Sequence, residues 1–245
     1  KTEEEKEASK TMGDDTPDAV LSSHFRPVSH YFRQNFSQVT NPPIDSLREN
    51  KVMSLKTRFG NLGNILDFDN LTKDDIFVLD SPILTNAQFK KFTKIFSKKI
   101  KIIDCTFNIN SSLKDRIEDI RLECETAVRE GSTTIILSDK EISSNKASIP
   151  SPLIVGAVHS HLVKQGLRGY CSLNVECSDA LDTHSFAVLI GVGATTINPY
   201  LAIDSIFQRY EKKLFGKFDF NECVKRFKKS IDGGLLKIMS KMGIS

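Results

Sequence analysis

Short apolar segments alternate with long amphipathic segments over the last two thirds of the chain, and this alternation constrains the fold more than any other feature. A short bounded apolar run is typical of a buried strand, and an apolar stripe with helical spacing is typical of a helix packed on a sheet. Strands separated by helices pair in parallel through right-handed crossovers. We therefore expect an α/β fold, with an open, mostly parallel sheet of four to five strands that resembles part of a β/α barrel and is covered by helices. The expected strands are residues 76–80, 101–107, 133–138, 172–177 and 186–193.

Capping residues mark where the expected helices begin. Thr85 and Gln88 form a capping-box pattern, and Ser151 followed by Pro152 is an N-cap with proline at the first helical position. The connection 178–185 is too short for a full helix, so we expect a single helical turn there. The expected helices are residues 45–57, 85–97, 112–130 and 151–164, with two more that begin at residues 198 and 219.

A proline-rich segment interrupts the N-terminal part of the chain, which otherwise has a helical pattern. Pro42 and Pro43 fix φ and remove two backbone donors, and each disfavours a helical conformation of the residue before it. The chain must therefore cross this region in an extended form. Asp45 follows as a candidate N-cap for the next helix. We call residues 40–45 the strap.

The composition is that of a globular chain with a weak electrostatic signature. A net charge of +3 does not indicate a nucleic-acid partner, and no apolar run reaches the ~20 residues of a membrane-spanning helix. The number of cysteines is odd and their spacing contains no Cys-x-x-Cys, which argues against a disulfide framework or a zinc site. We therefore expect a cytoplasmic protein with reduced cysteines. The cysteines are Cys105, Cys124, Cys171, Cys177 and Cys223.

Gly191 and Gly193 come nearest to a nucleotide-binding motif. They follow an expected strand, as in a dinucleotide-binding loop, but the third glycine and the acidic partner are missing. A tight turn is the favoured interpretation. A free-standing α/β module that binds a small molecule or a nucleotide near residues 191–196 is the alternative function.

The histidines do not form a metal-binding pattern. His159 and His161 are two residues apart in an expected helix, where their side chains point to different faces. His184 lies near Asp179 and Asp182 in the sequence, at the edge of the expected strand 186–193. We expect these histidines to take part in polar networks, and we assign no metal site and no catalytic residue.

Many short motifs, in one order along nearly the whole chain, resemble the central domain of the large (alpha) subunit of glutamate synthase. Residues 38–45 belong to this set, and residues 234–245 are similar to the entrance of the FMN-binding barrel that follows this domain in the family. The family usually has three histidines where this chain has His159, Ser160 and His161. The other motifs are residues 12–17, 26–27, 31–32, 52–55, 62–66, 79–82, 104–107, 149–151, 157–162, 166–168, 184–194 and 197–202.

The resemblance implies a division of the chain into three parts. Residues 1–13 are expected to be a polar linker or disordered terminus, residues 14–232 the central α/β connecting domain, and residues 233–245 the truncated start of the FMN-binding domain. The implied partners are the amidotransferase and FMN domains of the same parent polypeptide, with a small electron-donating subunit or ferredoxin. No nucleic acid and no membrane is expected as a partner.

In the family, the amidotransferase domain hydrolyses glutamine with a terminal cysteine, and ammonia passes through an internal tunnel to a domain that carries FMN and an iron–sulfur cluster. There the ammonia combines with 2-oxoglutarate, and the product is reduced to glutamate. This sequence has neither the terminal cysteine nor a cysteine cluster. The isolated chain is therefore expected to bind no cofactor and to catalyse neither half-reaction.

The strap is the candidate site for a tunnel role. Neutral ammonia needs a dry and nearly uncharged wall. Residues 40–44 offer a hydroxyl, an amide and backbone carbonyls without a formal charge, and Pro42 and Pro43 stiffen the backbone. Our hypothesis is that Thr40 and Asn41 line or gate the ammonia path, with Pro42 and Pro43 holding them; Ile44 and Asp45 complete the candidate site. The alternative is a structural spacer, in which the strap only docks a neighbouring domain.

Overall fold

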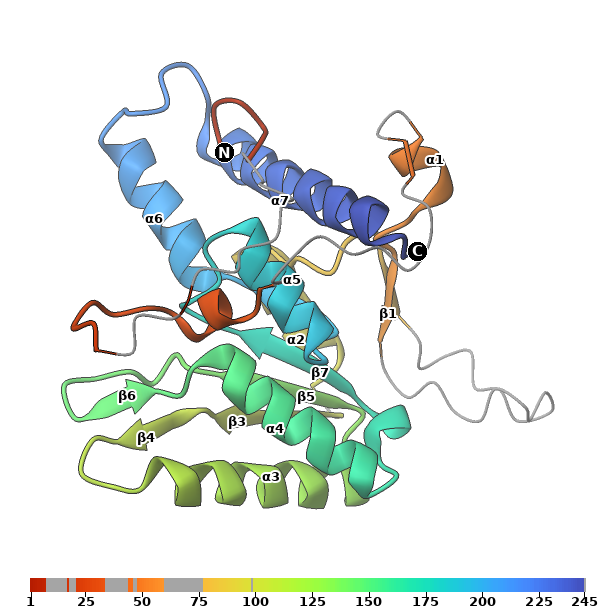
Figure 1. Cartoon of the computed structure of the whole chain (residues 1–245), viewed down its shortest axis with the longest axis vertical. Coiled ribbons are helices and arrows are strands. Elements are labelled where there is room, and N and C mark those ends of the chain that lie inside the picture. The colour runs from red at the N-terminus through yellow and green to blue at the C-terminus, as the bar shows by residue number, and fades with distance from the viewer. Residues whose placement is uncertain are drawn as a thin grey trace.

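The centre of the fold is a parallel sheet of four strands, as the sequence predicts (Figure 1). The computed structural model describes residues 1–7, 17, 21–33, 44–45, 48–59, 77–97 and 99–244. The strands lie in the order β3-β5-β7-β8, and every neighbouring pair is parallel. Their bounds are β3 Ile100–Asp104, β5 Thr134–Ser138, β7 Ser172–Glu176 and β8 Thr196–Asn198.

The helices that connect these strands lie on one face of the sheet. They are α3 (Leu113–Arg129), α4 (Ser151–Lys164) and α5 (Thr183–Gly191). Each strand is added on the same side of the one before it, so right-handed crossovers place all three helices on the same face, as in part of a β/α barrel. Figure 1 shows α4 in front of the strands, with α3 below it and α5 above it. The strand order never reverses among the described strands, so it creates no switch-point crevice of the kind that binds nucleotides in doubly wound folds.

The two faces of the sheet have different chemistry. Ile135 and Leu137 belong to the main core with the connecting helices, whereas Ile136 packs against α2 (Asn86–Ile95) on the opposite face. On that opposite face β7 carries polar side chains, and this explains why its sequence is less apolar than that of β5. Asn174 is fully buried there, and its Oδ1 accepts a hydrogen bond of 2.6 Å from Thr196 Oγ1.

The strand expected at residues 186–193 is wrong, because this segment forms most of helix α5. Asp182 is the N-cap, and its Oδ1 accepts hydrogen bonds from Ser185 N (2.8 Å) and Ser185 Oγ (2.6 Å). A short apolar run suits a buried helix as well as a buried strand, and α5 packs against α4 and α7. The last strand of the sheet is instead the three-residue β8.

The segment before the sheet also differs from expectation. The expected buried parallel strand 76–80 is β2 (Phe77–Leu79), which pairs antiparallel with β1 (Thr57–Phe59) and leaves Val78 51% exposed. The expected helix 45–57 is reduced to α1 (Glu49–Val52), because the chain turns extended at Met53 and pairs with β2 soon afterwards. Asp45 does not cap α1, whose N-cap is Arg48.

The remaining elements follow the capping signals closely. The capping box of Thr85 opens α2, and Asp219 is the N-cap of the long helix α7 (Phe220–Met242). The expected strand 101–107 is divided, since Cys105 separates β3 from β4. Ser151 is the first residue of α4 and not its N-cap. The other elements are η1 (Val28–Tyr31), β4 (Thr106–Asn108), β6 (Lys146–Ser148), η3 (Arg168–Tyr170) and α6 (Tyr200–Glu211).

Candidate functional site

The downstream end of the strap lies on helix α7. Thr40, Asn41, Pro42 and Pro43 lie outside the described residues, whereas Ile44 and Asp45 are described. The N–H of Ile44 donates to the carbonyl oxygen of Ser240 (3.2 Å), and Ser240 Oγ donates to the carbonyl oxygen of Ile44 (2.8 Å). Both backbone polar groups of Ile44 are therefore held by one residue of α7, 196 positions away along the chain.

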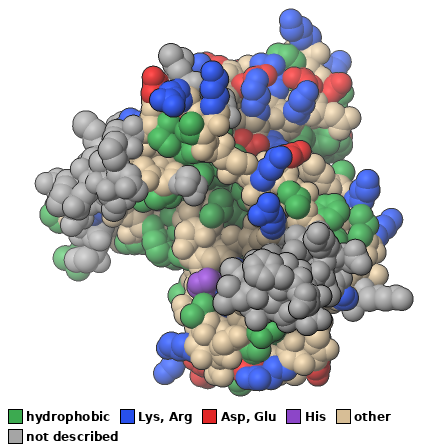
Figure 2. Space-filling model, turned by 90° about the vertical axis from the view of Figure 1, so that its right-hand side faces the viewer, with side chains coloured by type: hydrophobic (Ala, Val, Ile, Leu, Met, Phe, Trp, Pro, Cys, Tyr) green, Lys and Arg blue, Asp and Glu red, His purple; other side chains and the backbone are tan. Residues whose placement is uncertain are grey.

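A hollow of about 1110 Å³ follows α7 beside this contact. Ile44 and Ser240 border it, but the described lining also includes six lysines and four acidic residues. Figure 2 shows this mixture of basic and acidic side chains over the upper part of the molecule, where Figure 1 places α7. A wall with so many charges does not match the dry path that neutral ammonia needs. Among the described lining residues, Ile44 is the one that belongs to the predicted site.

The N-terminal residues pack on the same helix. Arg226 of α7 donates to the carbonyl oxygens of Thr2 and Glu3 (both 2.8 Å). Glu5 forms ion pairs with Arg226 (2.9 Å) and with Lys229. Figure 1 shows the N-terminal loop crossing over α7. Residues 1–7, although polar as expected for a linker, thus lie fixed against the domain; residues 8–13 lie outside the described part.

Helices α5 and α7 approach each other closely at Thr183 and Gly234. A Cβ built on Gly234 would lie 2.5 Å from Thr183 Cγ2. Glu7 holds Thr183 from the other side, since its Oε2 accepts hydrogen bonds from Thr183 N (3.0 Å) and Thr183 Oγ1 (2.6 Å). The N-terminal segment, α5 and α7 therefore form one packed unit, and α7 runs unbroken through the domain boundary predicted between residues 232 and 233. That boundary stays a prediction.

The carboxyl edge of the sheet, the usual place for a site in α/β proteins, carries polar groups that are bound to one another. Asp139 follows β5, and its Oδ2 accepts hydrogen bonds from Ser178 N (3.0 Å) and Ser178 Oγ (2.6 Å). Burial raises the pKa of Asp139, and these hydrogen bonds oppose the rise. Glu176 accepts from Ser138 (2.7 Å) and pairs with Lys140 (2.8 Å).

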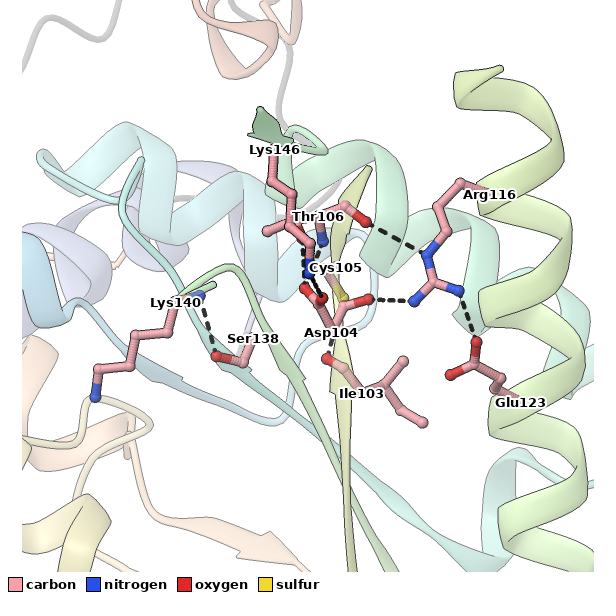
Figure 3. Close-up of polar contacts among 9 residues, drawn as sticks. All are labelled: Ile103, Asp104, Cys105, Thr106, Arg116, Glu123, Ser138, Lys140 and Lys146. Carbon is pink, nitrogen blue, oxygen red and sulfur yellow. Dashed lines mark hydrogen bonds and ion pairs between the residues drawn. The ribbon is translucent and has the colours of Figure 1, made fainter. Parts of the chain in front are cut away.

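The same edge is reinforced at β3. Arg116 reaches from α3 to the carbonyl oxygens of Asp104 (2.7 Å) and Thr106 (3.3 Å), as Figure 3 shows. Lys146 of β6 pairs with Asp104 Oδ2 (3.3 Å). These contacts join strands and a helix. They do not place a nucleophile beside a base, so we assign them a structural role at this edge of the sheet.

Each of the three histidines considered in the sequence analysis has a hydrogen-bonding partner within the chain. His161 Nε2 lies 2.6 Å from Glu125 Oε2, His159 Nδ1 accepts from Arg168 Nε (3.1 Å), and His184 Nε2 lies 2.8 Å from the carbonyl oxygen of Ser29. His184 lies in the first turn of α5, not at a strand edge. The polar-network interpretation is confirmed for these residues. Within the described ranges, no group of three or more His, Cys, Asp or Glu residues is arranged to hold a metal ion.

Sequence reasoning missed Arg168, which joins several elements at the amino edge of the sheet. Besides His159, it binds the carbonyl oxygens of Cys171 (2.7 Å) and Gly193 (3.0 Å). Gly193 has φ of +119°, and its backbone packs directly against the His159 side chain. The glycine pair therefore ends helix α5 and precedes β8, so the interpretation as a strand-end nucleotide loop is wrong. The motif 166–168 and the glycines were visible in the sequence, but their contact in space was not.

The cysteine thiols are expected to be unreactive. All five are free and buried. Burial raises the pKa of Cys124 to about 12 and that of Cys171 to about 11, so neither thiol ionises readily.

Among the helices of the described part, none is long and apolar enough to cross a membrane.

Asp182 should make the stability of α5 depend on pH. Burial raises the pKa of Asp182, but the hydrogen bonds from Ser185, with the nearby Lys1 and His184, bring it below its usual value. A lowered pKa means that the stabilisation is present above the unfolded-state pKa and is lost as pH falls through the folded-state pKa. We expect Asp182→Ala to cost about 1 kcal/mol near neutral pH and progressively less below about pH 4. Urea unfolding across this range measures the difference. Asp182→Asn, which keeps a capping oxygen, is the control and should show the smaller loss at neutral pH.

Comparison with known proteins covers the whole chain. The family model described as "Glutamate synthase central domain" matches residues 1–245. The chain is 53% identical over 246 residues to the glutamate synthase [NADPH] large chain of Azospirillum brasilense, which covers 99% of this chain and 16% of that protein. It is 39% identical to the corresponding large chain of Bacillus subtilis (96% and 15%) and 40% identical to the chloroplastic ferredoxin-dependent glutamate synthase of Spinacia oleracea (98% and 16%). The chain thus spans about a sixth of the length of these relatives.

Proposed function

The chain belongs to the family of glutamate synthase central domains, and from this we propose that it is the connecting domain of a glutamate synthase that makes glutamate from glutamine and 2-oxoglutarate. The match over all 245 residues carries the proposal. Family membership favours this proposal over the alternative, a free-standing nucleotide-binding module. The glycine pair on which that alternative relied lies at the end of helix α5.

The parent enzyme that we propose joins two chemistries. An amidotransferase domain releases ammonia, and a domain with FMN and an iron–sulfur cluster uses it. The names of the relatives include NADPH-dependent and ferredoxin-dependent enzymes, so either a small electron-donating subunit or ferredoxin fits as the partner. We place this protein in the cytoplasm. The isolated chain is proposed to be inactive in both half-reactions, because its five cysteines are free and buried and the family resemblance assigns both reaction centres to the neighbouring domains.

Within that enzyme, the strap is proposed to form part of the ammonia path. Two features support this role. Residues Thr40 to Ile44 contain no charge and two prolines, which suits a rigid wall for a neutral molecule. The strap is also fixed close to its downstream end, since Ile44 is bound through both of its backbone groups to Ser240.

Thr40→Phe in the complete enzyme tests this proposal. A bulky ring should obstruct the path, so ammonia would escape and glutamine would be hydrolysed without matching consumption of 2-oxoglutarate. We expect the ratio of glutamine hydrolysed to 2-oxoglutarate consumed, measured in one reaction mixture, to rise clearly above unity. Thr126→Phe, on the exposed side of α3, is the matched control and should keep the ratio at unity. A ratio of unity in Thr40→Phe would instead favour the structural-spacer role.

A further inference from the structure

The contact between Ile44 and Ser240 fixes a short segment of backbone unusually well. The two hydrogen bonds run in opposite directions, from Ile44 N–H to Ser240 and from the Ser240 hydroxyl to Ile44. Such a pair determines both the position and the rotation of the peptide groups around Ile44. A single bond would leave the segment free to turn about it.

Ser240 is itself held rigidly. It is only 2% exposed and lies in the last turn of α7, where its carbonyl oxygen also accepts from the N–H of Gly243 (3.3 Å). Serine is a mediocre helix former, and its hydroxyl commonly bonds to its own helix. Here the hydroxyl donates outside the helix, to the strap. Its position is thus explained by the strap better than by the helix.

We propose that Ser240 is a positioning residue for the strap. It fixes the backbone of Ile44, the described residue of the strap that lies nearest in sequence to the proposed ammonia path. Ser240 also belongs to residues 234–245, the segment that resembles the entrance of the flavin-binding barrel. A shift of α7 at this end would therefore move Ile44 with it. The part of this inference that concerns ammonia rests on the proposed function, whereas the anchoring itself does not.

The anchor is tested first in the 245-residue chain by amide hydrogen exchange. Ser240→Ala removes the hydroxyl donor but keeps the carbonyl acceptor, so the Ile44 amide should exchange roughly five- to tenfold faster, as for the loss of one ordinary hydrogen bond. Ser230→Ala is the matched control. Ser230 lies on the same helix and is equally buried, but its hydroxyl has no hydrogen-bond partner among the described residues. It should leave the Ile44 amide unchanged, and Ser240→Thr, which retains a hydroxyl, should restore slow exchange.

The second measurement is the ratio of glutamine hydrolysed to 2-oxoglutarate consumed in the complete enzyme. Faster Ile44 exchange together with a raised ratio in Ser240→Ala supports both the anchor and the ammonia path. Faster exchange with a ratio of unity supports the anchor and rejects the path. Unchanged Ile44 exchange overturns the anchor whatever the ratio. An equal increase at the core amide of Ile135 also overturns it, because the effect would then be global unfolding.

Discussion

Gly193→Ala is expected to destabilise the chain by about 3 kcal/mol, from backbone strain and overpacking together. The residue has φ of +119°, a conformation that side chains disfavour. A Cβ at this position would lie 2.4 Å from His159 Nδ1. His159 is not free to yield, because its ring accepts from Arg168 and Arg168 also binds the carbonyl oxygen of Gly193. Urea unfolding of the 245-residue chain measures the loss.

Two further variants separate the causes of this loss. Gly131 also has a positive φ, of +97°, but nothing lies within 4 Å of a Cβ built on it. Gly131→Ala should therefore cost only the conformational part, about 1 kcal/mol. In a His159→Ala background the cost of Gly193→Ala should fall, because the ring is gone, but stay above that of Gly131→Ala, because the Cβ of residue 159 would still lie 2.9 Å from the new Cβ. If Gly193→Ala and Gly131→Ala cost the same in the native background, the contact with His159 is not what requires glycine.

The sheet and its caps could be predicted because their signals are local. Strand β5 is a bounded apolar run, and Ser112 and Asp219 precede their helices directly, where a short polar side chain can accept from the first turn. Helix α5 could not be predicted in the same way. Residues 186–190 are all apolar, and Phe186, Val188 and Leu189 are buried where α5 packs on α4 and α7. An unbroken apolar run lacks the period that distinguishes helix from strand.

Only part of the candidate site could be predicted from the sequence, for a related reason. The prolines show that the strap is rigid, but Ser240 gives no sign that it receives the strap, because the contact joins residues 196 positions apart. Arg168 and His159 illustrate the same limit. Each lies in a recognisable motif, yet their hydrogen bond and their shared contact with Gly193 depend on how α4 and α5 pack. Local pattern identifies which residues are unusual, and packing decides what they do.

Gly234→Ala is expected to destabilise the chain by about 2 kcal/mol, as overpacking in a helix interface does. The new Cβ would lie 2.5 Å from Thr183 Cγ2 and 2.6 Å from Thr183 Oγ1. Thr183 cannot easily retreat, because both its N–H and its hydroxyl donate to Glu7. Helices α5 and α7 would have to separate, and the N-terminal segment would lose its alignment with them. The free energy of unfolding in urea gives the size of the effect.

Gly233→Ala, one residue away in the same helix, is expected to have the opposite effect on stability. Gly233 is exposed in the same helix, and nothing lies within 4 Å of a Cβ built on it. Replacing glycine by alanine in an open helix position should stabilise by up to about 1 kcal/mol. Helix propensity alone would make both variants stabilising, so only close packing on Thr183 predicts opposite signs. Two stabilising variants would show that α5 and α7 are not held together at this point. Thr183→Ser in the Gly234→Ala background should recover part of the loss, because it removes the nearest methyl group and keeps the hydroxyl that binds Glu7.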